Sequence, residues 1–221
     1  MLQIPTVPRH DWKQTAAEFG FGFHTIDDEP YWTEDRYFQF TLQQVEQGIE
    51  DPTEELHQMS LKAIERVVGC DELMAKFQIP EDMWPLVRES WKRKDPCLYS
   101  RMDFAYDGKN HAKLLEINSD TPTSLYELGF FGWMWLEQKV DRGDIPKEAD
   151  QFNLLQELLV ERFRELKPFL PFNTLHFASC KETEEDRGTV QYMQDCAHDA
   201  GINTEFVYVE DIGISECEKF F

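Results

Sequence analysis

Four polar residues of this chain carry the side chains that a metal and phosphate site needs. Arg101 and Asp103 lie in the segment CLYSRMDFAY, and Glu116 and Asn118 lie in the segment HAKLLEIN. The two segments flank the turn-forming residues DGKN and alternate between apolar and polar side chains. This pattern predicts a β-hairpin whose strands carry all four candidate residues.

One register of this hairpin separates its polar side chains from its apolar ones. Opposed residues of an antiparallel pair follow a fixed register, and successive side chains point to opposite faces. In that register Asp103 faces Glu116, and Arg101 faces Asn118. The apolar pairs on the other face are then Phe104 with Leu115 and Met102 with Ile117.

The polar face of the hairpin suits Mg²⁺ and a phosphoryl group. Two acids opposed across a strand pair repel each other, at a cost near the ~0.2–1 kcal/mol of a typical cross-strand pair, unless a cation lies between them. Asp103 and Glu116 offer anionic oxygens and Asn118 a neutral one, which suits Mg²⁺ when water and phosphates complete its coordination. Arg101 could bind a phosphoryl or carboxylate group. The alternative is a solvent-facing surface ion pair between Arg101 and one carboxylate.

Helices are predicted on both sides of the hairpin. Residues 33–94 have apolar side chains at helical spacing, with Thr33 as the first cap and Asp51-Pro52 as the start of a second helix. Further helices are predicted at residues 124–140 and 152–166, separated by the polar segment DRGDIPKEAD, a candidate linker.

A strand–helix–strand unit is predicted after residue 172. The strands TLHFAS and TEFVYV flank a helix from about residue 184 to 200 with Gly201 as its stop signal, which implies parallel strands. An acidic loop follows the first strand, where open α/β sheets bind ligands, and it could attract a cationic amine. Its acids could instead compensate the dipole of the helix that follows. These acids are Glu182, Glu184, Glu185 and Asp186.

Composition restricts the class of partner. With 43 acidic and 22 basic residues the net charge is −21, so repulsion disfavours nucleic acid and anionic membrane surfaces as partners. The chain is 41% hydrophobic and 14% aromatic, enough for a substantial core. The five cysteines show neither a CxxC pair nor a partnered histidine, and the first residues lack a signal-peptide pattern. A cytoplasmic location without a membrane span is therefore expected.

A long segment around the hairpin resembles a known protein family. The stretch YSRMDFAYDGKNHAKLLEINSDTPTSLYELGFFGWMWLE is similar to the signature segment of the glutathionylspermidine synthase family, whose members use an ATP-grasp fold. Within it, RMDF followed by LLEINSDTPTSL resembles the metal-binding hairpin and the substrate loop of that family. The resemblance extends over nearly the whole chain, from DWKQTAAEFGF to ETEEDRGTVQYM.

The resemblance implies an ATP- and Mg²⁺-dependent carbon–nitrogen ligase that forms an amide through an acyl phosphate. A glutathione-like acid and a polyamine-like amine would be its substrates. Asp103, Glu116 and Asn118 would bind magnesium and, together with Arg101, the nucleotide. Arg101 would also be the catalytic residue that stabilises the transferred phosphoryl group. A helix cap is the alternative role for the hydroxyls of the substrate loop. The implied substrate-binding residues are Thr121, Thr123, Glu184 and Glu185.

The expected fold is α+β or α/β. Residues 1–172 would form a helical region with the catalytic hairpin, and residues 173–221 a βαβ unit like that of a pre-ATP-grasp domain. This unit looks incomplete, because a parallel sheet would keep an open edge. The nucleotide-clamping part of the enzyme would then lie beyond the last residue, and the chain alone would be inactive. Two alternatives remain, namely a noncatalytic acidic module that binds amines or polyamines, and an ATP-grasp ligase with other substrates.

Overall fold

The computed structural model describes residues 1–120, 122–170 and 172–214 as a mixed α/β chain. The chain divides into two compact units. The first comprises Met1–Leu2 and Gln39–Ser119, and the second comprises Gln3–Phe38 and Asp120–Phe221. The expected division after residue 172 concerns the arrangement of a longer enzyme and stays a prediction. Across the described residues, no helix combines the length and the apolar character that crossing a bilayer would require.

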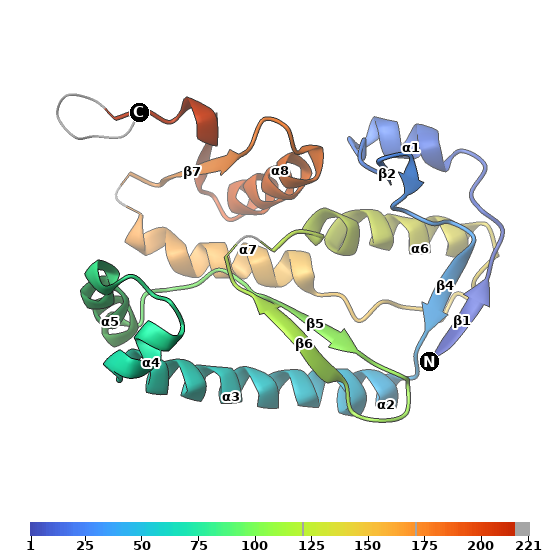
Figure 1. Ribbon diagram of the computed structural model, residues 1–221. Helices are drawn as coiled ribbons and strands as arrows, with labels where there is room; N and C mark the ends of the chain where they lie inside the picture. The colour runs from blue at the N-terminus through green and yellow to red at the C-terminus, as the bar shows by residue number, and fades with distance from the viewer. Residues whose placement is uncertain (121, 171, 215–221) are drawn as a thin grey trace. The chain divides into compact units, whose positions relative to one another are not determined.

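The first unit combines a β-hairpin with a long, segmented helix and shorter helices (Figure 1). The strands of the hairpin are β5 (Arg101–Ala105) and β6 (Lys113–Asn118). The helical segments are α2 (Leu42–Val45), the π-helical turn η1 (Glu46–Glu50), α3 (Asp51–Val68), α4 (Asp71–Lys76), the 3₁₀ turn η2 (Glu81–Met83) and α5 (Trp84–Arg93).

The predicted start of the first helix at Thr33 is wrong. Residues Arg36–Gln39 form strand β4, and the helix begins only at Leu42. The cap is Thr41, whose hydroxyl accepts the backbone N–H of Gln44 at 3.2 Å while its own N–H donates to the Gln44 side chain at 3.0 Å. This reciprocal capping box satisfies two backbone donors at once. Asp51-Pro52 does start a second helix, α3, as predicted, although α2, η1 and α3 follow one another directly.

The π-helical turn anchors the hairpin to this helix at Gly48. Pro52 has no N–H, so the Gly48 carbonyl four residues earlier lacks its usual helical donor. The N–H of Ala112, next to β6, donates to that carbonyl at 3.1 Å. A Cβ on Gly48 would lie 2.2 Å from the Tyr106 hydroxyl, which donates to the Gln44 carbonyl at 3.3 Å. Glycine therefore permits the close approach that holds both ends of the hairpin turn on the helix.

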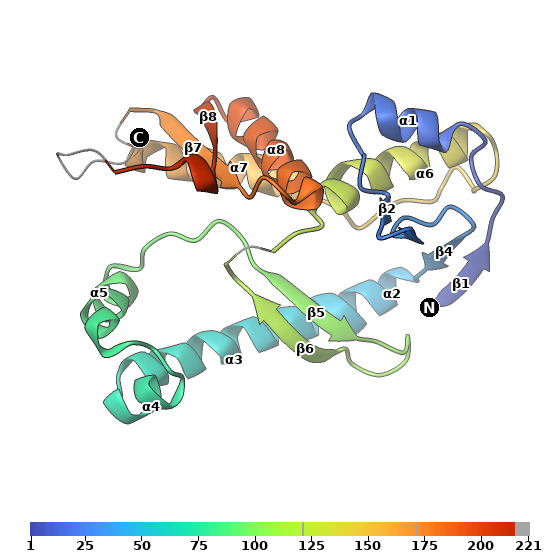
Figure 2. The ribbon, with the colours of Figure 1, turned by 45° about the horizontal axis from the view of Figure 1, so that its top comes forward.

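The second unit contains a βαβ unit, two short strand pairs and further helices (Figure 2). Strand β1 (Leu2–Pro5) pairs with β4, and β2 (Thr25–Ile26) pairs with β3 (Glu29–Pro30). The helical segments outside the βαβ unit are α1 (Trp12–Glu18), the π-helical turn η3 (Glu127–Phe131), α6 (Gly132–Asp141), α7 (Leu155–Leu166), and the 3₁₀ turns η4 (Lys167–Phe169) and η5 (Val209–Asp211).

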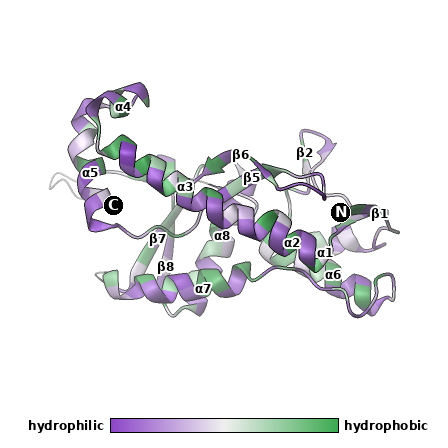
Figure 3. Cartoon of the chain, turned by 90° about the horizontal axis from the view of Figure 1, so that it is seen from below, coloured by the Kyte–Doolittle hydropathy of each residue, from purple (hydrophilic) through white to green (hydrophobic). Residues whose placement is uncertain are grey.

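The predicted βαβ unit is confirmed. Strands β7 (Thr174–Ser179) and β8 (Asn203–Tyr208) are parallel, and α8 (Glu184–Asp199) connects them. Gly201 follows the helix with a φ of 78°, a left-handed conformation that glycine adopts without strain. In Figure 3, α7 carries both hydrophilic and hydrophobic residues, as expected of a helix with one face against the core.

Aromatic residues form the main core of the second unit. Phe21 and Phe131 are fully buried, with ring centroids 4.5 Å apart in an edge-to-face arrangement. A buried ion pair borders this core, because Arg9 donates to Glu34 at 2.6 Å and its Cζ lies 5.3 Å from the centre of the Phe131 ring. The rest of the cluster is Ala16, Phe23 and Met134, with Trp12, Trp32, Tyr126 and Phe130 packed against it.

Candidate functional site

The hairpin brings its four predicted site residues together. Arg101 pairs with Asn118 and Asp103 with Glu116, as the sequence pattern predicts. Met102 pairs with Ile117, which also agrees with the predicted register. The four polar residues lie on the same face, because residues two apart in a strand share a face.

The predicted pairing of Phe104 with Leu115 is wrong. A β-bulge after Asp103 shifts the register by one residue, so that Phe104 pairs with Leu114. The ladder skips Leu115, whose side chain is 69% exposed. A bulge increases the local twist of a strand pair and commonly occurs beside functional sites. Here it comes directly after the two opposed acids and leaves their pairing intact.

Arg101 joins the two acids of the hairpin. Its Nε lies 2.8 Å and its Nη2 3.1 Å from the Asp103 carboxylate, and Nη2 lies 3.4 Å from Glu116 Oε1. The hydrogen bonds to Asp103, and then the charges of Asp103 and Glu116, raise the pKa of Arg101. The side chains are partly exposed, at 30% for Arg101, 37% for Asp103 and 61% for Glu116. Solvent therefore weakens these ion pairs, and a divalent cation could compete for the same oxygens.

The donor set of the hairpin fits Mg²⁺ that is also bound by a substrate. Mg²⁺ prefers oxygen ligands and commonly takes one or two carboxylates from the protein, with water and phosphates completing the octahedron. Asp103 and Glu116 supply the carboxylates, and Asn118 supplies an amide oxygen one pair further along. Within the described ranges, no group of three or more His, Cys, Asp or Glu side chains could hold a metal. A metal here would therefore depend on Asn118 and on oxygens from outside the chain.

The loop predicted to bind substrate lies in the second unit, and only part of it is described. Thr121 falls outside the described residues, and Thr123 is partly buried. Ser124 has a φ of 73°, a left-handed conformation that is strained for a residue with a side chain. The Ser124 carbonyl accepts the N–H of Leu128 at 3.2 Å, so the next helix begins directly after it. Backbone strain of this kind often marks a binding loop.

The acidic loop continues directly into helix α8. Glu184, Glu185 and Asp186 occupy the first turn of this helix, and Glu182 is exposed before it. Acids in the first turn stabilise a helix through its dipole, which was one of the two predicted roles. Glu184 also lies close to Gly22, where an added Cβ would be 3.2 Å from Glu184 Oε2. The loop therefore faces the segment that leads to β2.

Sequence reasoning missed an important acid, Glu127, at the start of η3. Its side chain is only 6% exposed, and Oε1 accepts a hydrogen bond from the Tyr31 hydroxyl at 2.5 Å. Oε2 is buried and has no hydrogen-bond partner among the described residues. Burial raises the pKa of Glu127, and the charge of Glu185 raises it further, while the Tyr31 hydrogen bond lowers it. A signal was present, since Glu127 is an isolated acid in the apolar run LYELGFFGWMW.

Aromatic rings lie beside Tyr31, the hydrogen-bond partner of Glu127. The Phe23 ring lies 6.2 Å from that of Tyr31 and 6.3 Å from that of Tyr126. Burial and the hydrogen bond to Glu127 raise the pKa of Tyr31 to about 12, so its phenol keeps its proton at neutral pH. Buried or half-buried carboxylates beside aromatic rings suit the ammonium group of an amine. We call Glu127, Glu184, Glu185 and Tyr31 the acidic site.

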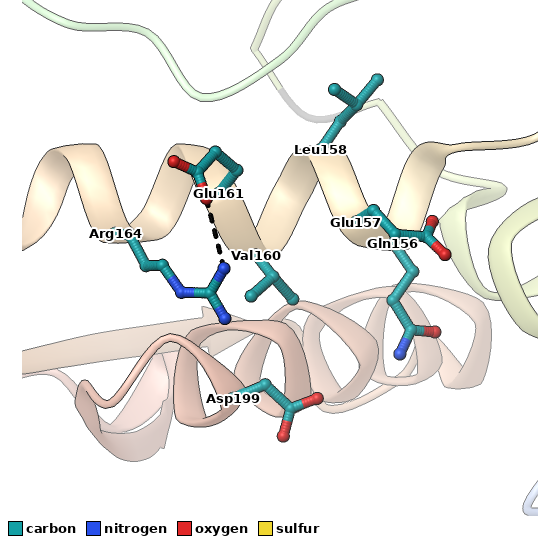
Figure 4. A pocket seen from close by; sticks show the side chains of 7 residues that line it. All are labelled: Gln156, Glu157, Leu158, Val160, Glu161, Arg164 and Asp199. Carbon is teal, nitrogen blue, oxygen red and sulfur yellow. Dashed lines mark hydrogen bonds and ion pairs between the residues drawn. The ribbon is translucent and has the colours of Figure 1, made fainter.

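A separate pocket lies between α7 and α8 and contains none of the predicted site residues (Figure 4). Its charged side chains include Glu161 and Arg164, which form an ion pair at 3.2 Å, and Asp199 from the end of α8. Leu158 points away from α8 in this view. Because the charged residues here are partly paired with one another, we assign the pocket no role in the site.

Comparison with known proteins identifies the family. Residues 3–221 match the sequence profile described as glutathionylspermidine synthase preATP-grasp, which is nearly the whole chain. The chain belongs to this glutathionylspermidine synthase family. The resemblance predicted from the hairpin and substrate-loop motifs is therefore confirmed.

Several curated proteins are similar to the chain. A protein of Haemophilus influenzae named as an acid–amine ligase is 37% identical over 226 residues, covering 98% of this chain and 54% of that protein. The bifunctional glutathionylspermidine synthetase/amidase of Escherichia coli is 32% identical over 185 residues, covering 82% of this chain and 27% of that protein. Trypanothione synthetase of Crithidia fasciculata is 37% identical over 84 residues, covering 38% of this chain and 13% of that protein.

The chain spans about half the length of the first of these relatives, and less of the others. The first of these relatives is named as an acid–amine ligase, and the other two are named as synthetases of glutathionylspermidine and of trypanothione. The matched part contains both the hairpin and the acidic site, since the family profile covers residues 3–221.

Proposed function

We propose that this chain provides the metal-binding hairpin and the amine-binding site of an ATP-dependent carbon–nitrogen ligase of the ATP-grasp type. The observation that carries the proposal is the hairpin register, which sets Asp103 opposite Glu116 and Arg101 opposite Asn118. The names of the relatives support a reaction between an acid and an amine. We propose a glutathione-like peptide as the acid and a polyamine as the amine.

In the proposed reaction, a carboxylate oxygen of the acid attacks the γ-phosphorus of ATP, and ADP leaves. The amine then attacks the carbonyl carbon of the acyl phosphate, phosphate leaves, and the nitrogen loses a proton to form the amide. Bound Mg²⁺, held by Asp103, Glu116 and Asn118, would neutralise phosphate charge. Arg101 would orient the transferred phosphoryl group through its planar pair of donors and stabilise the charge that develops on it.

Arg101 gives the proposal a direct test, because it would compete with the metal for the carboxylates of Asp103 and Glu116. Replacing Arg101 with Met should increase the affinity of the chain for Mn²⁺, used as a probe for Mg²⁺, by roughly tenfold. In this variant Asp103 and Glu116 lose their ion pairs with Arg101, which are worth up to about 1 kcal/mol each. The two carboxylates then repel each other, and this repulsion favours a cation between them. The measurement is an electron paramagnetic resonance titration, in which the signal of free Mn²⁺ reports the bound fraction.

Arg93→Met is the matched control, since Arg93 forms an exposed ion pair with Asp95 in the same unit. It should leave Mn²⁺ affinity unchanged. If wild type and Arg101→Met both bind no Mn²⁺, or if the control increases binding equally, the hairpin is only a surface ion-pair network. The ligase proposal would then lose its metal site.

The acidic site gives a second, independent test through the amine. Glu127→Gln should weaken the binding of spermidine by about 10- to 100-fold, because a hydrogen bond to a charged group is worth about 1.5–3 kcal/mol. The measurement is calorimetric titration of the chain at moderate ionic strength. Asp195→Asn is the control, since Asp195 is an exposed acid further along α8. Equal losses in the two variants would mean that spermidine responds to net charge alone.

A noncatalytic amine-binding module is the second candidate function. The buried, unpartnered Oε2 of Glu127 favours it, because this feature needs neither metal nor nucleotide. Spermidine binding that depends on Glu127, together with no Mn²⁺ binding at the hairpin, would support the module over the ligase. Binding of both would support the ligase.

A further inference from the structure

We propose that Tyr31 is a positioning residue for Glu127, holding one carboxylate oxygen so that the other is left to accept a hydrogen bond from the ammonium group of the amine. The role of the amine rests on the proposed function. The positioning itself is a property of the chain without ligand, and it can be measured without one.

The contacts of Glu127 divide its two oxygens into separate roles. Oε1 accepts from the Tyr31 hydroxyl at 2.5 Å, whereas Oε2 is buried without a partner among the described residues. Leaving a buried carboxylate oxygen without a hydrogen bond is costly, and a purely structural acid would be expected to use both oxygens. The Tyr31 side chain is 39% exposed, so this edge of the acidic site borders solvent. An incoming ammonium group could therefore supply the missing donor.

The backbone holds Tyr31 in place for this contact. Tyr31 directly follows β3, and both it and Trp32 donate their N–H groups to the His24 carbonyl, at 3.1 Å and 3.0 Å. These two bonds tie the end of the short β2–β3 pair to its start, so they hold the backbone of Tyr31 in place. The hydroxyl of Ser124 also interacts with the Tyr31 phenol and lowers its pKa, as a donor to the phenol oxygen would. The phenol proton is then directed to Glu127.

The charges around Glu127 predict how its titration responds to Tyr31. The groups that face it are Tyr31 from the loop after β3, Tyr126 on its own segment, and Glu185 from α8. Burial raises the pKa of Glu127 and Glu185 raises it further, and the Tyr31 hydrogen bond acts in the opposite direction. Removing the hydroxyl should therefore raise the pKa again. Since only the ionised carboxylate attracts an ammonium group strongly, amine binding should be weakened most at low pH.

The first experiment measures the Glu127 pKa in the absence of ligand. The side-chain carboxyl carbons of glutamate are labelled with ¹³C, Glu127→Gln identifies the resonance, and the pH is varied. Tyr31→Phe should shift the titration of Glu127 upward. Tyr126→Phe is the matched control, because the Tyr126 hydroxyl donates to the Phe19 carbonyl at 2.7 Å and not to Glu127, so the titration should stay where it is. An unchanged Glu127 titration in Tyr31→Phe would overturn the inference.

The second experiment follows spermidine binding by calorimetry at two pH values. Tyr31→Phe should weaken binding roughly tenfold near about pH 6 and by a smaller factor near about pH 8, because a higher pKa of Glu127 leaves more of its carboxyl group protonated at the lower pH. A loss of equal size at both pH values would indicate general damage to the site and would overturn the positioning role. If wild type binds no spermidine, the proposed function fails, and the NMR titration still decides the role of Tyr31.

Discussion

Replacing Asp103 with Asn should lower the affinity of the chain for Mn²⁺ by at least roughly 10–100-fold. Loss of an outer-shell partner typically costs a metal site this much, and Asp103 would be a direct ligand. The variant keeps the size of the side chain and removes one of the two opposed anionic oxygens. It also removes the strongest partner of Arg101, whose Nε lies 2.8 Å from the Asp103 carboxylate. The free arginine would then stay close to Glu116 and compete with the metal for the remaining acid. The Mn²⁺ paramagnetic resonance titration measures the effect.

Asp95→Asn controls for the loss of a negative charge in the same unit, because Asp95 forms an exposed ion pair with Arg93 outside the hairpin. Its Mn²⁺ affinity should match that of wild type. Glu116→Gln should reproduce the loss, since Glu116 is the direct cross-strand partner of Asp103. Retention of wild-type affinity in both hairpin variants, with unchanged circular dichroism, would contradict a metal site at this position.

The hairpin register could be predicted because its evidence is local. Alternation alone fixes which residues share a face, and the pairs from Arg101 to Asp103 follow it. Alternation does not reveal the bulge, because Leu114 and Leu115 are both apolar and either could have paired with Phe104. The ambiguity is resolved by the contacts that fix the hairpin turn on the long helix, and these come from residues distant in the sequence.

The error at the first helix has a similar cause. The run RYFQF contains aromatic residues at a spacing that fits a helix or a strand, and its pairing with β1 is a contact between distant segments. A stronger local signal was available in Thr41 and Gln44, whose spacing is that of a capping box. Apolar side chains at helical spacing are not always buried, since Met59 is 56% and Ile64 45% exposed in α3.

The acidic site depends on contacts between residues that are distant in the sequence. The acids of α8 could be identified from a strand end followed by a helix, but the importance of Glu127 depends on Tyr31, which lies 96 residues earlier in the chain. Its burial is a property of the tertiary structure, which alternation and helical period cannot predict. An isolated acid in an aromatic run is the part of this information that the sequence does contain.

The buried ion pair between Arg9 and Glu34 makes the second unit sensitive to a single substitution. The Arg9 side chain is 0% and that of Glu34 2% exposed, and Glu34 accepts hydrogen bonds from both Nε and Nη2 of Arg9, at 3.0 Å and 2.6 Å. Glu34→Ala should lower the free energy of unfolding by about 3–5 kcal/mol, because it leaves a buried guanidinium without its counter-charge. Chemical denaturation followed by tryptophan fluorescence measures the change.

Two further variants distinguish the effect of an unpaired buried charge on stability from the effect of lost side-chain packing. Arg9→Met combined with Glu34→Leu should recover most of the stability, since replacing a buried pair by apolar residues of similar volume is often neutral. Asp35→Ala removes the neighbouring acid, which forms only an exposed ion pair with Arg36, and should change stability by less than about 1 kcal/mol. A small effect of Glu34→Ala, or no recovery in the double variant, would contradict this account. Because Trp32 donates to Glu34 at 2.7 Å and directly follows Tyr31, loss of the ion pair should also loosen the contact between Tyr31 and Glu127.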